Sequence, residues 1–204
     1  MSYKEREKGR REREILLCAR HLIHENGYVD LNMDNLAVAV GISKPTLYQH
    51  FKSKDDVIVH VLIDGMEEVE EYLLTESEES PLERLKIALR LILVNRYGTH
   101  GLLNDFEADV LTSALHTHPD VITVKRRVLT EAERLIDQGK ANGEIISTIP
   151  TPLISVLLFK LLGVLSTPQC FKHPMDADVL TSHIENIVEM FVRAIATPVT
   201  PSLS

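Results

Sequence analysis

The sequence has little that would suit a secreted, membrane-bound or redox protein. Its two cysteines, Cys18 and Cys170, lie far apart and match no metal-binding or disulfide-exchange spacing, so we interpret them as reduced, buried thiols. No secretory segment precedes them, and we expect a cytoplasmic location. The longest apolar run, residues 153–165, contains Lys160 and is shorter than the roughly 20 residues that a membrane-spanning helix needs. We therefore expect no membrane association.

An excess of basic charge is also missing. The formal net charge of −8 at first disfavours a nucleic-acid-binding protein, but the charge is unevenly distributed. Residues 1–60 hold ten Lys or Arg against nine Asp or Glu, whereas the rest of the chain holds twelve against twenty-one. Any DNA binding by the near-neutral N-terminal part must therefore depend on a few placed contacts and on dimer geometry more than on general electrostatic attraction.

Motifs for catalysis are absent as well. The sequence contains no nucleophile motif, phosphate-binding loop or pair of metal ligands, so we expect neither enzymatic activity nor a cofactor. What the chain does have is ample apolar material, with 44% hydrophobic residues. These residues recur with helical periodicity, and nothing indicates a strand. We predict an all-α protein of about nine helices.

Residues 35–51 predict two short helices joined by a glycine turn. Ala37 is small where the second helix must approach the first, and Gly41 can take the positive φ that the turn needs. Ser43 can cap the second helix, whose first turn accommodates Pro45. We expect the apolar contacts between the helices to come from Leu36, Val40, Ile42 and Leu47. The second helix keeps a polar face suited to phosphates and base edges in a major groove, formed by Lys44, Thr46, Tyr48, Gln49 and His50.

The flanking segments predict the rest of a small helical head. An amphipathic pattern that begins at Ile15 indicates a helix over about residues 11–26, ending at Gly27. Asn32 can cap the next helix, predicted over residues 33–40, and the second helix of the motif is predicted over residues 44–51. A fourth helix begins at Lys54. Leu47 and Phe51 are predicted to be core residues.

Together, residues 15–62 resemble the TetR family of regulators. The resemblance implies an all-helical homodimer whose N-terminal three-helix head binds a palindromic operator, and whose C-terminal body carries the effector and dimerisation sites. It also implies transcriptional control, usually repression, relieved here by a small, largely apolar organic effector. The family more often has Thr where this chain has Asn32. The family's DNA contacts fall on Asn32, Lys44, Pro45, Thr46, Tyr48, His50 and Lys54, to which we add Ser43 and Gln49.

The domain organisation follows from this resemblance. We predict a helix-turn-helix DNA-binding domain over residues 1–55, an effector-binding and dimerisation domain over residues 56–199, and a tail over residues 200–204. The N-terminal tract, in which six basic residues alternate with Glu, has two interpretations. It is either a solvated helix extension held by i,i+4 pairs or a DNA-seeking arm that uses Arg10, Arg11 and Arg13.

The body is predicted to continue as helices. A helix that begins at Pro81 is apolar nearly all round between residues 85 and 94, which indicates the middle of a bundle. Further helices are predicted over residues 102–115 and from Pro119 to about residue 139, with a loop over residues 167–176. Helices over residues 153–166 and 178–196 carry more apolar surface than one subunit can bury, so we expect them to form a four-helix bundle with a second copy. The alternative is that both helices are intramolecular core.

The candidate effector pocket consists of polar side chains among apolar ones on the middle helices. Its predicted lining is Tyr72, Asn95, Arg96, Tyr97, His100, Asn104, Phe106, Glu107, His116 and Arg126. A metal-responsive regulator of the same fold is an alternative, because His100, His116, His118 and His173 accompany Cys170 and Glu107, but no spacing resembles a structural zinc site, and we predict no metal ligand. A helical enzyme and a protein-binding dimer are alternatives of a different class.

Overall fold

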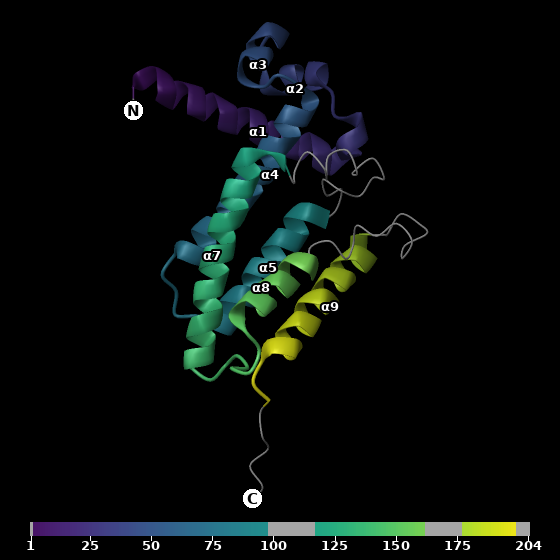
Figure 1. Ribbon diagram of the computed structural model, residues 1–204. Helices are drawn as coiled ribbons and strands as arrows, with labels where there is room; N and C mark the ends of the chain where they lie inside the picture. Colours follow the sequence, from purple (N-terminus) through teal and green to yellow (C-terminus); the bar gives the residue numbers. More distant parts are fainter. Residues whose placement is uncertain (1, 98–116, 162–176, 199–204) are drawn as a thin grey trace, which may run out of the picture. The chain divides into compact units, whose positions relative to one another are not determined.

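The computed structural model describes residues 2–97, 117–161 and 177–198, which form helices joined by loops (Figure 1). The helices are α1 (Tyr3–Asp30), α2 (Met33–Val40), α3 (Lys44–His50), α4 (Lys54–Leu74), α5 (Pro81–Tyr97), α7 (Pro119–Ala141), α8 (Thr151–Leu161) and α9 (Ala177–Ile195). The described residues hold no strand, only an isolated bridge between Ile145 and Ala196. The predicted all-helical fold is confirmed for this part of the chain, in which no helix is both long and apolar enough to cross a membrane.

The chain divides into two compact units. The first contains the described residues up to Gly65, together with 95–97 and 117–122; the second contains 66–94, 123–161 and 177–198. Three helices, α4, α5 and α7, therefore contribute residues to both units. The predicted domain boundary between residues 55 and 56 stays a prediction.

The first unit is built on α1, α2, α3 and the start of α4. Its core consists of apolar side chains that are nearly or wholly removed from solvent: Ile15, Ala19, Ile23, Leu36, Ala37, Leu47, Phe51, Val57, Ile58 and Val61. These residues recur every three or four positions along α1 and α4, as expected for helices with one buried face. The predicted core positions Leu47 and Phe51 are both confirmed, with 0% and 2% of their surface exposed.

Helix α1 is longer than predicted at both ends. It continues through Gly27 to Asp30, because a glycine costs a helix only about 1 kcal/mol and ends it mainly where it takes positive φ. At the other end, α1 begins at Tyr3 instead of about residue 11. Pairs between Arg10 and both Glu7 and Glu14 connect side chains three and four residues apart in these added turns, where such pairs support a helix.

The second unit contains the end of α4, most of α5 and α7, and α8 with α9. Arg84 is buried in it and donates from Nη2 to the carbonyl oxygens of Tyr72, Leu73 and Thr75, at 3.2, 2.7 and 2.7 Å. This guanidinium therefore caps the C-terminal end of α4, whose last carbonyls have no partner within the helix.

Helix α5 is apolar on most sides, but only one stripe of its side chains is buried. Leu85, Leu89 and Leu93 are buried, whereas Leu91 and Val94 are 37% and 47% exposed. The prediction that α5 lies in the middle of a bundle is therefore met on one face of the helix and not on the face of Leu91 and Val94.

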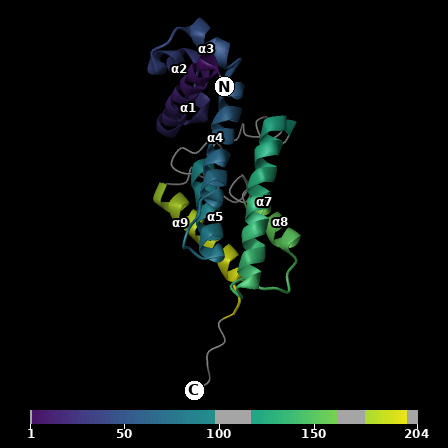
Figure 2. The same ribbon diagram turned by 90° about the vertical axis from the view of Figure 1, so that its left-hand side faces the viewer.

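The C-terminal ends of α7 and α9 come together in Figure 2. The Ile146 N–H donates to the Ile195 carbonyl, and the Thr197 N–H donates to the Glu144 carbonyl, both at 2.8 Å. These bonds connect the α7–α8 loop to the end of α9. The predicted helix over residues 102–115, the loop over 167–176, the end of the predicted helix over 153–166, and the tail lie outside the described residues.

Candidate nucleic-acid interface

The turn between α2 and α3 has the predicted geometry. Gly41 adopts φ 75° and ψ 31°, its N–H donates to the Val38 carbonyl, and the Ile42 N–H donates to the Ala37 carbonyl, both at 3.0 Å. A Cβ at position 41 would meet nothing within 4 Å. Glycine is therefore favoured here by the left-handed backbone and not by lack of space.

Two side chains cap the helices of the motif as predicted. The Asn32 Oδ1 accepts a hydrogen bond from the Asn35 N–H at 2.8 Å, and the Ser43 Oγ accepts one from the Thr46 N–H at 3.2 Å. Ser43 also lies 2.7 Å from the Thr46 hydroxyl, and Pro45 occupies the first turn of α3. Both helix starts are thus fixed by local bonds.

The outer face of α3 carries most of the predicted DNA-contacting side chains. Lys44, Pro45, Tyr48 and Gln49 are exposed, and Thr46 is half-buried because it packs against its own cap. A donor on Lys44, a phenol on Tyr48 and an amide on Gln49 therefore lie along one short helix. Those groups can bind phosphates and purine edges.

Lys44 is held by a partner that the sequence pattern did not reveal. Its Nζ lies 2.5 Å from the Asp34 Oδ1, across the turn in α2. The hydrogen bond to Asp34, followed by the charge of the same carboxylate, raises the pKa of Lys44 above its ordinary value. Asp34 thus favours the charged form of Lys44 and competes with a phosphate or base for its ammonium.

His50 does not share the solvent-exposed face that was expected for it. Its side chain is only 13% exposed, and Nδ1 lies 3.3 Å from the Glu12 Oε1 of α1. The reason is its position in the last turn of α3, where its ring contacts Glu12 of α1. His50 therefore connects the C-terminal end of α3 to α1 and is not part of the exposed polar face of α3.

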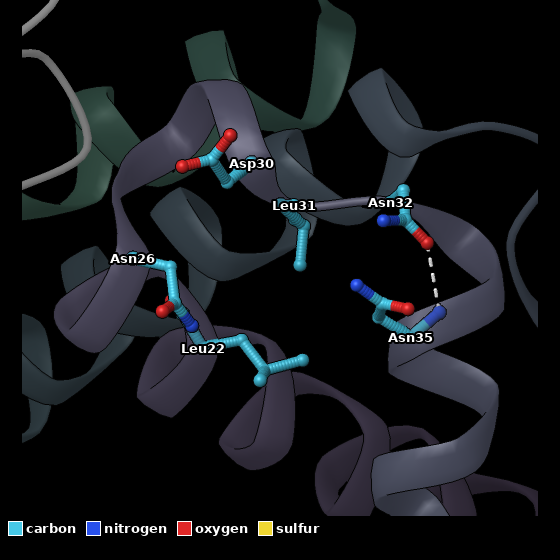
Figure 3. A pocket seen from close by; sticks show the side chains of 6 residues that line it. All are labelled: Leu22, Asn26, Asp30, Leu31, Asn32 and Asn35. Carbon is cyan, nitrogen blue, oxygen red and sulfur yellow. Dashed lines mark hydrogen bonds between the residues drawn. The ribbon is translucent and has the colours of Figure 1, made fainter.

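Asn32 borders an open hollow of about 400 Å³ at the junction of α1 and α2. Figure 3 shows its oxygen directed at the backbone of Asn35 and its amide nitrogen left on the other side. The amide can therefore cap α2 and still offer a donor, as a threonine hydroxyl would. The side chains that line the hollow are Leu22, Asn26, Asp30, Leu31, Asn32 and Asn35.

The turn into α4 places Lys54 half-buried at the first position of that helix. Ser53 accepts from the Asp56 N–H at 3.1 Å, and Asp56 accepts from the Lys52 N–H at 2.7 Å. These two bonds, one to the capping serine and one from the residue before it, fix where α4 begins and with it the position of Lys54.

The predicted effector residues fall largely outside the described part of the chain. Of those whose side chains are described, Tyr72 donates to Glu79 at 2.8 Å, and burial followed by this bond raises its pKa to about 12. Asn95 and Arg126 are exposed. The remaining side chains are not described: Arg96, Tyr97, His100, Asn104, Phe106, Glu107 and His116.

The described part of the metal candidate is His118, whose ring centroid lies 6.4 Å from that of His60. Among the described residues, no group of three His, Cys, Asp or Glu side chains is placed to hold a metal ion. The other proposed ligands, including Cys170 and His173, lie outside that part.

Comparisons with known proteins agree with this geometry. Residues 15–61 match the model of a family described as bacterial regulatory proteins, tetR family. The fatty acid metabolism regulator protein of Bacillus subtilis is 22% identical over 151 residues, which are 72% of this chain and 76% of the relative. The transcriptional activator FasR of Mycolicibacterium smegmatis is 40% identical over 52 residues, about a quarter of either chain. The structure of FadR from B. subtilis in complex with stearoyl-CoA is similar with a TM-score of 0.56 and 19% identity, covering 88% of this chain and 96% of that one.

Proposed function

Because the chain belongs to the TetR family and is a DNA-binding transcriptional regulator, we propose that it acts as a homodimeric repressor of a palindromic operator, released by a small, largely apolar organic effector. The observation that carries the DNA-binding part is the outer face of α3. That face is fixed by caps and by two buried anchors, and it presents Lys44, Tyr48 and Gln49 to solvent.

In this proposal α3 enters the major groove. Lys44 and Gln49 read purine edges, because an ammonium suits guanine acceptors and an amide suits adenine. Tyr48, Lys54 and the amide nitrogen of Asn32 bind phosphates, which set the register of α3 along the groove. Pro45 and Thr46 offer apolar surface to a thymine methyl. Ser43 and His50 position α3 without binding DNA themselves, Ser43 by capping the helix and His50 by its contact with α1.

The second copy of the chain is proposed to dock on α8 and α9. Leu153, Val156 and Leu157 on α8 are about half exposed, as is Val179 on α9, and Met190 is 70% exposed. Apolar surface of this kind on two neighbouring helices suits an isologous four-helix bundle. Two recognition helices would then meet half-sites roughly 34 Å apart or somewhat more.

The effector is proposed to bind in the body, over residues 56–199. Two of the comparisons suggest its chemical class, because one is with a fatty acid metabolism regulator of B. subtilis and the other with B. subtilis FadR solved with stearoyl-CoA. A long acyl thioester joins a large apolar part to a polar end, which fits an apolar pocket with a few polar groups.

A titration of labelled DNA from the region upstream of the chain's own gene tests the DNA-binding part. We expect specific binding that Lys44→Ala weakens by about 5- to 150-fold, with altered base preference, since a good bidentate base contact contributes about 1–3 kcal/mol. Lys86→Ala, which removes the same charge from α5, should change binding little. Absence of any specific complex with the wild-type chain would contradict the proposal.

A thermal-shift assay tests the effector part. A ligand present at about 100 times its Kd adds about 2.7 kcal/mol of stability, which corresponds to about 5–10 °C in Tm for a chain of this size. Stearoyl-CoA should produce such a shift and release the DNA, whereas coenzyme A alone should not. A reporter fused to the same upstream region then separates repression from the activation named for FasR.

A further inference from the structure

The first three turns of α1 extend beyond the core of the head. Between Tyr3 and Glu14 every residue is exposed or half-buried, and the first buried side chain is Ile15. We call residues 3–14 the arm. Figure 1 shows it projecting past α2 and α3 as a continuation of α1. Burial of an apolar face does not stabilise this part of the helix, so its helical structure and its charge must be explained in another way.

The arm carries the positive charge of the head. Residues 3–14 hold six Lys or Arg and four Glu, whereas residues 15–60 hold four Lys or Arg and five Asp or Glu. Without the arm, the head that contains the recognition helix would be net negative. Electrostatic attraction to a polyanion must therefore come from the arm.

The arm lies beside the end of the recognition helix. His50, the last residue of α3, contacts Glu12 of α1 at 3.3 Å. From Tyr3 to Glu12 the helix rises about 14 Å, at ~1.5 Å for each residue after the first. A major groove is about 12 Å wide, so an arm that starts at the end of α3 reaches the phosphates that border the groove.

One face of the arm is basic and continues the buried face of α1. Lys4, Lys8 and Arg11 are spaced i, i+4 and i+7, and the same stripe runs on into Ile15 and Ala19, which are both fully buried. This stripe therefore lies on the side of α1 against which the rest of the head packs.

The partners of these basic side chains are weak competitors for phosphate. Lys8 pairs with Glu12 at 3.6 Å and Arg11 with Glu14 at 2.7 Å, both within the exposed helix. Lys4 has no side-chain partner among the described residues. Exposed pairs on one helix contribute little and are screened by salt, so phosphates can replace them.

We propose that the arm is a second DNA-binding element, in which Lys4, Lys8 and Arg11 bind phosphates flanking the major groove that α3 occupies. This inference rests on the proposed DNA binding by α3. Of the three contacts expected for such an arm, it keeps Arg11 and leaves out Arg10 and Arg13, because both lie on another face of the helix, where Arg10 is paired with two glutamates. The arm supplies affinity independent of base sequence, which the near-neutral head otherwise lacks.

Two triple variants of the arm test the proposal. The first changes Lys4, Lys8 and Arg11 to Gln; the second changes Arg6, Arg10 and Arg13 to Gln. Both sets share the i, i+4, i+7 spacing and the same loss of charge, but they occupy different faces of one helix. Glutamine preserves helix propensity, and circular dichroism checks that both variants keep the wild-type helix content.

Binding to the upstream duplex and to a random-sequence duplex is measured by fluorescence anisotropy between 50 and 200 mM salt. For the first variant we expect at least tenfold weaker binding to both duplexes and a log–log salt slope shallower by about 2–3, since each phosphate contact contributes about 0.9. The second variant should keep a salt slope within about 0.9 of the wild-type value, which is the contribution of one phosphate contact. Equal effects of the two variants, or no effect of the first, would overturn the proposal. If the wild-type chain shows no preference for the upstream duplex but the two variants still differ on random DNA, the proposed operator binding is wrong and the proposed DNA binding by the arm is still supported.

Discussion

Replacing Leu47 by alanine separates the two faces of the recognition helix. Helix α3 has seven residues, and isolated helices shorter than about 12–15 residues are marginal in water. It therefore depends on Leu47 and Phe51, which are 0% and 2% exposed. Leu→Ala in a packed core costs about 2–5 kcal/mol. A domain of roughly 60 residues buries only about 60% of its surface and is itself marginal, so Leu47→Ala should remove most of the stability of α2 and α3.

The matched variant is Gln49→Ala, two residues further along the same helix and exposed. Hydrogen exchange read by mass spectrometry reports local opening. Peptides covering residues 33–51 should exchange on the order of 30-fold to 4,000-fold faster in Leu47→Ala, because about 2–5 kcal/mol is lost and each 1.4 kcal/mol is a factor of ten. Gln49→Ala should exchange like the wild type and still bind DNA more weakly. Wild-type protection in Leu47→Ala together with lost DNA binding would refute the packing argument, because Leu47 would then act as a contact.

Three further changes have defined outcomes. Asp34→Asn removes the partner of Lys44, so DNA affinity in a titration should rise at low salt and converge on the wild-type value at high salt; a fall would show that the pair positions Lys44 for binding. Arg84→Met removes the guanidinium that donates to the carbonyls of Tyr72, Leu73 and Thr75 at the end of α4 and should lower the free energy of unfolding in urea by about 2–4 kcal/mol; an unchanged midpoint would contradict the capping role. Gly139→Ala places a Cβ 2.6 Å from the Ile145 Cδ1. The overpacking should cost about 1–3 kcal/mol, more than the gain of about 1 kcal/mol from replacing a glycine within a helix, so Tm in calorimetry should fall. A higher Tm would mean that the Ile145 side chain moves away freely.

The helix-turn-helix could be predicted from sequence because its signals are local. Asn32 and Ser43 each bind a backbone N–H three residues ahead, and Gly41 supplies positive φ where the two helices join. Every one of these relations connects residues close in the chain. A single sequence therefore contains the information that sets the start of α2, the turn and the start of α3.

Features that depend on distant residues could not be predicted in the same way. The end of α1 was expected at Gly27, but a glycine ends a helix only where the surrounding fold favours positive φ, and α1 continues to Asp30. His50 was expected on the exposed face, yet its partner Glu12 is 38 residues away. Ion pairs have no periodicity that relates such positions, and the same holds for Lys44 and Asp34.

The contacts of α3 at its two ends explain how a near-neutral head can bind DNA selectively. Asp34 holds the first side chain of α3, and Glu12 holds the last. Between them, Leu47 fixes the rotation of the helix about its axis because it is fully buried. A helix fixed in position and rotation loses less conformational freedom on binding, so fewer contacts are needed for a given affinity. A phosphate or base that binds Lys44 also competes with the Asp34 carboxylate. In the proposed complex, a phosphate alone would replace one anionic oxygen by another, whereas a guanine edge beside a phosphate would add directed acceptors, so we expect the pair to favour base recognition over general attraction.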